Sequence, residues 1–331
     1  TDVSQIRENC GRALALIAWD FTGNGRTSLF VANDTSANFL FHNHAADADG
    51  IPQFSEEAVL RGLAFDADGN AQASMGVAAN DANRDGKIDL FVTNFQHESN
   101  TFYSQGPDGL FLDLTRQFGL RDSSYGMLGF GTQFADIDGD GWDDLIATNG
   151  HVDKRFGADE QDRMRPQLFR NVDGNSFREV PRDSLGEFFQ QDYLGRGLAT
   201  LDWNLDGQTD FAVSNLHAPF ALVTNHTPPA RQSFAVRLIS TTGVRDGSGA
   251  IIRSKISGRD QFRLAVAGGG YLTTNQQSFS FSVSDEDRIE ELEVTWKNGD
   301  VQQWVVPSVC CDVVLVQGRE LPVLAQIPAE K

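Results

Sequence analysis

Four times along the chain, a short apolar run ends in an acidic loop and a second apolar run follows. The first unit has apolar residues at 14–19, a loop at 20–28 and further apolar residues at 29–32. Apolar runs this short, bounded by Gly, Asp and Asn, are typical of β-strands rather than helices. The sequence therefore predicts four pairs of strands, each joined by an acidic loop.

The four loops share one spacing of oxygen-bearing side chains, at positions 1, 3, 5 and 9, with glycine at position 6. Calcium takes about six to eight oxygen ligands, and a tight loop supplies them from these positions and from the backbone carbonyl at position 7. Glycine allows the positive φ of the sharp turn. The predicted calcium ligands are Asp20, Thr22, Asn24, Arg26 and Ser28; Asp81, Asn83, Asp85, Lys87 and Asp89; Asp136, Asp138, Asp140, Trp142 and Asp144; and Asp202, Asn204, Asp206, Gln208 and Asp210.

An EF-hand and a set of ordinary turns both fit the loops less well than a calcium loop between two strands. An EF-hand needs a glutamate at position 12, where this chain has Val31, Val92, Ala147 and Val213. Asp, Asn and Gly also form ordinary turns, but four loops in one register favour calcium. The third loop has the most carboxylates and the first has only Asp20, so we expect the third to bind most tightly and the first to be weakest or empty, with about three or four ions per chain.

The repeat extends beyond the loops. Their first aspartates lie at positions 20, 81, 136 and 202, a spacing typical of propellers or solenoids. Two more short strands follow in the first three units, so each holds four strands, as a propeller blade does. Small residues, namely Ala15, Gly76, Gly131 and Gly197, precede each loop by five positions and suit an innermost strand crowded around an axis.

These features carry a resemblance to a known family. The four units resemble calcium-binding propeller repeats of the FG-GAP or VCBS type, notably at residues 30–35, 91–95 and 149–152. The chain as a whole is similar to the cartilage acidic protein family with its ASPIC/UnbV C-terminal domain, through residues 267–275 and 292–299. The resemblance implies an all-β fold with propeller blades, and it implies no agreed biochemical activity.

The size of the ring is open at this point. Four units could close as a four-bladed propeller, or they could be the last four blades of a larger ring. We favour the second, because the fourth unit runs from residue 224 into Pro228 and Pro229 without an outer strand, and because members of the family usually carry further blades upstream. A strand from residues 1–9 or from upstream sequence would complete that blade and cover its edge.

The repeat of acidic loops ends before Pro229. This divides the chain into blades at 1–228 and an all-β domain at 229–331. Six strand-like runs follow, with hairpin turns at Ser257-Gly258 and Asn298-Gly299. Residues 268–270 are three glycines, but no helix follows them as in a phosphate-binding loop. A tight turn or a close backbone approach accounts for them better.

Charge and composition indicate a location and exclude one class of partner. The net charge of −19 and the pI near 4.6 argue against nucleic acid. The sequence has no run of transmembrane length and no signal peptide, which indicates a mature or truncated chain. Calcium loops favour a secreted, cell-surface or periplasmic protein. Cys10 could pair with Cys310 or Cys311 under oxidising conditions, or all three could be free thiols.

The face opposite the calcium loops collects polar residues, because alternate connections of an antiparallel blade share a face. We expect a ligand there, at Asn33, Asp34, Asp66, Asp68, Asn94, His97, Glu98, Asn149, His151, Asp153, Asn215 and His217. The repeated asparagines could instead cap their own loops, and the histidines could be merely exposed.

The leading hypothesis is a non-enzymatic, calcium-stabilised module that binds a protein or a glycan. The alternative is a polysaccharide hydrolase or lyase that uses the histidine and carboxylate rim, although the chain has no nucleophile elbow or zinc-protease motif.

Overall fold

The computed structural model describes residue 6 and residues 11–152, 162–284, 286–305 and 312–324. Cys10, Cys310, Cys311, Asp153 and nearly all of the candidate strand at residues 1–9 lie outside the described residues.

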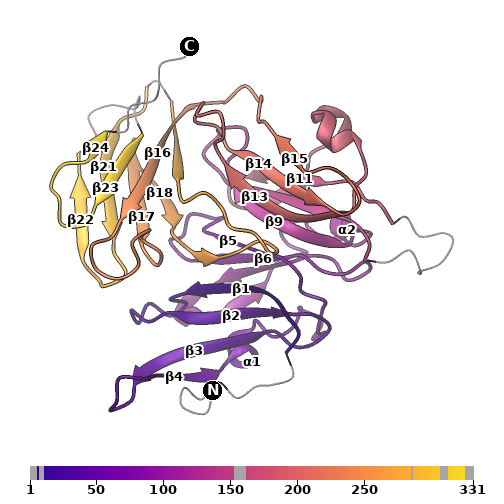
Figure 1. The fold of residues 1–331 in the computed structure, drawn as a ribbon, viewed down its shortest axis with the longest axis horizontal. Coiled ribbons are helices and arrows are strands. Elements are labelled where there is room, and N and C mark those ends of the chain that lie inside the picture. Colours follow the sequence, from indigo (N-terminus) through magenta and orange to yellow (C-terminus); the bar gives the residue numbers. More distant parts are fainter. Residues whose placement is uncertain (1–5, 7–10, 153–161, 285, 306–311, 325–331) are drawn as a thin grey trace.

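The described chain is all-β, with six sheets and only short helical turns. Figure 1 shows the first four sheets following one another as blades. Their strands are β1 (Ala13–Trp19), β2 (Ser28–Asn33), β3 (Phe39–Ala46) and β4 (Pro52–Glu56); β5 (Val77–Asn80), β6 (Asp89–Val92), β7 (Thr101–Gln105) and β8 (Phe111–Asp113); β9 (Gly129–Ala135), β10 (Asp144–Asn149), β11 (Gln167–Val172) and β12 (Ser176–Glu179); and β13 (Gly195–Leu201), β14 (Asp210–Asn215) and β15 (Ala221–Val223). The helical turns are α1 (Ala58–Arg61), α2 (Arg121–Ser124), η1 (Pro107–Gly109), η2 (Arg182–Ser184) and η3 (Glu187–Gln190).

Each acidic loop joins the first two strands of its blade, and the pairing within each blade is antiparallel. The fourth blade has three strands within the described residues, where the sequence also lacks an outer strand. Apolar side chains from neighbouring blades form the cores between them, as Phe102, Phe118 and Phe177 do between the second and third blades.

The small residues on the leading strands lie where neighbouring backbones approach. A Cβ atom added at Gly76 would lie 1.9 Å from the carbonyl oxygen of Phe130 on β9. One added at Gly131 would lie 2.5 Å from the carbonyl oxygen of Arg196 on β13. These glycines therefore allow the inner strands of consecutive blades to pack side by side.

The C-terminal part forms two further sheets around one core that includes Phe234, Phe281 and Trp304. Its strands are β16 (Gln232–Ile239), β17 (Ile251–Ile256), β18 (Arg259–Leu264), β20 (Phe279–Val283), β21 (Ile289–Thr295), β22 (Val301–Trp304), β23 (Val313–Val316) and β24 (Val323–Leu324). The one parallel pairing within the described strands joins β16 to β23. Ser257 and Gly258 both have positive φ at the turn between β17 and β18.

A segment of this C-terminal part, residues 267–276, contacts the leading strands of all four blades. Its short strand β19 (Ala267–Gly268) pairs with β1, and Gly270 exchanges backbone hydrogen bonds with Val77 at the start of β5. Asn275 donates to Gln133 on β9, and its side-chain oxygen accepts from the Thr200 amide on β13. We call residues 267–276 the central segment.

Candidate calcium loops and the opposite face

All four loops adopt one turn, organised by their first aspartate. The Asp81 carboxylate accepts from the backbone N–H groups of Asp85 (3.1 Å) and Gly86 (2.9 Å). Asp20 and Asp202 accept from the equivalent pairs of amides, and Asp136 accepts from Gly141. The glycine at position 6 has a φ between 78° and 91° in every loop. The first aspartate thus holds the backbone of the loop in its turn.

The third loop brings carboxylates together most closely. One oxygen each from Asp136, Asp138 and Asp140 lies within 4.8 Å of the others. Burial raises the pKa of Asp136 to about 6, and burial followed by the charge of Asp140 raises the pKa of Asp138. Asp136 Oδ1 is buried and has no hydrogen-bond partner within the described residues. This all-oxygen donor set fits calcium.

The aspartate at the ninth loop position accepts hydrogen bonds from two backbone amides, a role that the sequence spacing did not predict. Asp144 is buried and accepts from the amides of Ile137, at loop position 2, and Asn171, on the third strand of the blade. Asp89 and Asp210 make the same two contacts in their blades. Burial raises the pKa of Asp89 to about 7 and the pKa of Asp144 to about 8. These three carboxylates therefore tie the second, third and fourth loops to the third strands of their blades or to the residues just after them.

Arginine side chains surround the third loop, and sequence reasoning did not identify them. Arg170 on β11 forms ion pairs with Asp138 (2.8 Å) and Asp140 (2.9 Å). Arg84, from the second loop, stacks on the Trp142 ring and donates to the Gly141 carbonyl. The loop with the most carboxylates is therefore also the one with guanidinium groups beside it.

A side-chain amide on the third strand, or just after it, links the second, third and fourth blades each to the loop of the preceding blade. Gln105, Asn171 and Asn225 donate to the position-2 carbonyls of the preceding loops, at Phe21, Ala82 and Ile137 respectively. The donor–acceptor distances are 2.6, 2.9 and 2.9 Å. The sequence signal is an amide side chain that recurs in or just after the third strand of these blades, and sequence reasoning missed it.

Several predicted ligand residues of the opposite face meet in a cavity. Asp66, Asp68, His97 and Glu98 line a volume of about 360 Å³, which Arg116, Arg121 and Tyr125 also line. Glu98 uses its carboxylate to accept from the amides of Ala73 and Phe95, so part of its role is structural. Asp68 is paired with Arg116 at 2.9 Å. This cavity is lined by the second blade and by the connections that enter and leave it.

The other predicted residues of that face do not gather there. His151 is buried and its ring lies edge-on to Phe95, with centroids 5.6 Å apart. His217 is exposed in the fourth blade. Within the described residues, the three rim histidines do not form a group with carboxylates close enough to share a metal ion.

The repeated asparagines stabilise the loops that follow them through hydrogen bonds to the backbone. Asn33, Asn94, Asn149 and Asn215 each donate from Nδ2 to a backbone carbonyl of the following loop, at Ala37, Ser99, Arg165 and Pro219. The first three are buried. Their side-chain oxygens have no hydrogen-bond partner in the described part of the chain. Asp34 is half-buried beside Asn33, away from the cavity.

Comparison with known proteins agrees with this architecture. Residues 240–321 match the ASPIC and UnbV family model, and residues 81–147 match the FG-GAP-like repeat. Similar curated proteins are cartilage acidic protein 1 of Mus musculus (25% identical, covering 85% of this chain and 41% of the relative), Xenopus tropicalis (25%, 88% and 42%) and Homo sapiens (24%, 82% and 39%).

The chain spans about two fifths of the length of these relatives. No helix in the described part of the chain has the length and apolarity needed to cross a bilayer. The FG-GAP-like match and the successive antiparallel sheets fit a β-propeller-like fold. The FG-GAP-like match at residues 81–147, the ASPIC and UnbV match at residues 240–321 and the relatives at about 25% identity together fit the ASPIC/UnbV family.

Proposed function

We propose that the chain is a calcium-stabilised, propeller-like module that binds a protein or a glycan outside the cytoplasm. The carboxylate cluster of the third loop carries the calcium part of this proposal. Its oxygens lie within 4.8 Å of one another, and the buried Asp136 Oδ1 lacks a partner among the described residues. A divalent cation would stabilise this cluster, because close carboxylates in a desolvated site repel one another.

Calcium has a structural role in this proposal. The loops join the inner strands of each blade, and the ninth-position aspartates connect them to the third strands. An ion bound by the loop oxygens would therefore stabilise three strands of a blade at once. The ligands we propose are the side chains at positions 1, 3, 5 and 9 and the carbonyls at position 7, with about three or four ions per chain.

We propose the cavity lined by Asp66, Asp68 and His97 as the place where a polar partner binds. Its mixed charges, from these residues and from Arg116 and Arg121, suit the polar groups of a protein or a glycan. The three rim histidines lie at separate places, which favours binding over the hydrolase or lyase alternative. A location outside the cytoplasm is supported by the low affinity that suffices where calcium is abundant and by the relatives' name, which refers to cartilage.

Elemental mass spectrometry of protein purified without chelators tests the calcium proposal. We expect calcium in the protein, a lower melting temperature in EGTA, and recovery when calcium is restored. Asp138→Asn should weaken binding at one site, whereas Asp122→Asn, at an exposed position outside the loops, should not. Protein without calcium, with the same melting temperature in EGTA and in calcium, would refute it.

Glycan-array and cross-linking experiments with the calcium-loaded protein test the binding part. His97→Ala should reduce capture of any ligand that uses the cavity, and His217→Ala should not. Equal capture by both variants and the wild type would exclude this cavity as the site.

A further inference from the structure

The outer hairpin of the first blade carries two histidines and a glutamate on one face. His42 and His44 are two residues apart on β3, so their side chains project from the same side of the strand. Glu57 follows β4 directly, and its amide donates to the Leu40 carbonyl of β3. One nitrogen from each histidine and one oxygen of Glu57 lie within 4.8 Å of one another.

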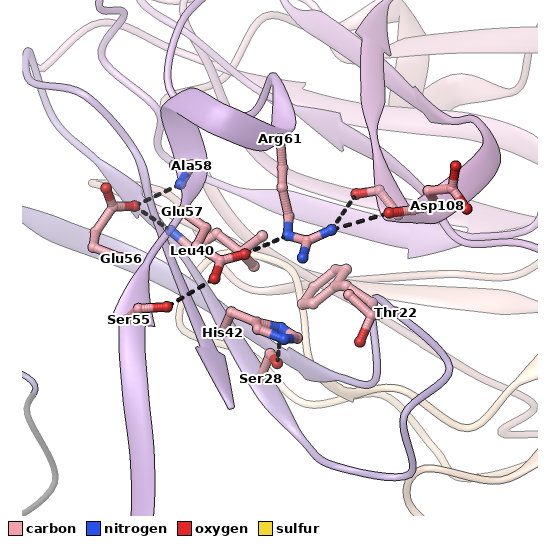
Figure 2. A network of polar contacts seen from close by, with 12 residues as sticks. Thr22, Ser28, Leu40, His42, Ser55, Glu56, Glu57, Ala58, Arg61 and Asp108 are labelled. Carbon is pink, nitrogen blue, oxygen red and sulfur yellow. Dashed lines mark hydrogen bonds and ion pairs between the residues drawn. The ribbon is translucent and has the colours of Figure 1, made fainter. Parts of the chain in front are cut away.

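Neighbouring polar groups hold the His42 and Glu57 side chains in place (Figure 2). Arg61 donates from Nε to Glu57 Oε2 at 2.8 Å and from Nη1 to the Asp108 carbonyl of the second blade. The other oxygen, Oε1, accepts from the Ser55 hydroxyl and lies 3.4 Å from His44 Nε2. His42 Nδ1 lies 3.3 Å from the Ser28 hydroxyl. Such outer contacts fix the orientation of metal ligands in known sites.

The histidines belong to the first blade alone. His42 directly precedes Asn43, whose amide donates to Ser28 at the ninth loop position. The equivalent positions in the other three blades are Ser104, Arg170 and Thr224, which each contact their own acidic loop. His42 likewise contacts its own loop through Ser28, so the contact is common to all four blades, but the first blade alone has an imidazole at this position. The first loop is also the one without a carboxylate at its ninth position.

We propose that His42, His44 and Glu57 form a site for a divalent transition metal ion of the Zn²⁺ class. Two imidazoles and one carboxylate are a donor set that suits zinc, whereas calcium prefers oxygen ligands. The His44 side chain is 51% exposed, which gives an ion access and leaves a coordination position for water. His42 is buried, at 7%, and anchors the site to the blade.

Isothermal titration with ZnCl₂, in excess calcium so that the loops are occupied, tests this site. We expect one zinc ion per chain and a rise in melting temperature. His44→Gln and Glu57→Gln should each weaken zinc binding by at least about tenfold. The matched control is His226→Gln, which changes an exposed histidine far from the hairpin in sequence and should bind zinc like the wild type.

Co²⁺ provides a second readout, because its visible absorption reports the coordination number and geometry of the bound ion. Equal zinc affinity in His44→Gln and the wild type, or no zinc binding at all, would overturn the proposal and leave the residues as a hydrogen-bonded cluster. If His44→Gln still binds calcium, a loss of zinc binding in this variant does not come from damage to the calcium loops. Zinc binding that calcium abolishes would mean occupation of the acidic loops and would also overturn it.

Discussion

Arg170 shows how one side chain changes the expected properties of a loop. By charge alone, the third loop has the most carboxylates, but Arg170 is paired with Asp138 and Asp140. The guanidinium is half-exposed, so each ion pair contributes modestly to stability. The same positive charge opposes a calcium ion at the two carboxylates.

Arg170→Gln should therefore increase the calcium affinity of the third loop, by several-fold, because a competing cation is removed. Calcium titration by calorimetry would measure this. Arg178→Gln is the matched control, since Arg178 lies directly opposite Arg170 on the neighbouring strand. Lower affinity in Arg170→Gln would mean that the guanidinium holds the loop in its binding shape.

Buried carboxylates give the calcium-free protein a defined dependence on pH. Burial raises the pKa values of Asp81 and Asp136 to about 6, of Asp89 to about 7 and of Asp144 to about 8. The folded state thus binds more protons than the unfolded state between about pH 4 and pH 8. The free energy of unfolding should fall as pH rises through this window.

Urea unfolding in EGTA at pH 5 and pH 8 measures the effect, and we expect lower stability at pH 8. Added calcium should restore more stability at pH 8 than at pH 5, because the ion binds deprotonated carboxylates. Stability in EGTA that rises with pH would contradict the raised pKa values.

At the scale of strands and loops, much of the first three blades was predictable from sequence. Spacing predicted the loops, and apolar runs predicted the strands on either side. The short strand β19 was not predictable, because residues 267–268 pair with β1, which lies far away in sequence. The ion pairs of Arg170 and the amide hydrogen bonds between blades were missed for a related reason. Their partners are determined by the strand register and by the packing of one blade on the next.

The amide links between blades make the loops part of the blade interface. Asn171→Ala should destabilise the protein by about 1–3 kcal/mol, because the buried carbonyls of Ala82 and Asp143 lose a donor. Chemical denaturation would measure the loss. Asn175→Ala, which removes an exposed contact within one turn, should cost less. Equal losses would show that the interblade bond adds nothing specific.

At the scale of the whole molecule, the central segment joins the C-terminal part to the blades (Figure 1). Gly268 has a φ of 95°, and a Cβ atom there would lie 2.1 Å from the Leu16 carbonyl oxygen. Sequence alone predicted a tight turn or a close backbone approach at the three glycines. It could not identify the backbone they approach, because that partner is fixed by the arrangement of the blades.

Gly268→Ala should separate the unfolding of the two parts, giving two thermal transitions or a broadened one in calorimetry. Gly299→Ala is the matched control, because Gly299 has a similar φ of 88° with nothing within 4 Å of an added Cβ. A single sharp transition, unchanged in Gly268→Ala, would show that the contact does not couple the two parts.

The central segment also has a consequence for the order of folding. It pairs with β1, yet more than two hundred residues separate Leu16 from Gly268, so this contact closes a very long loop. During synthesis, the inner strands of all four blades emerge before the residues that join them. Until then, the β1 edge that receives β19 is exposed, and exposed strand edges promote pairing between chains. A nascent chain stalled before residue 267 should therefore associate with other copies more readily than the full chain does.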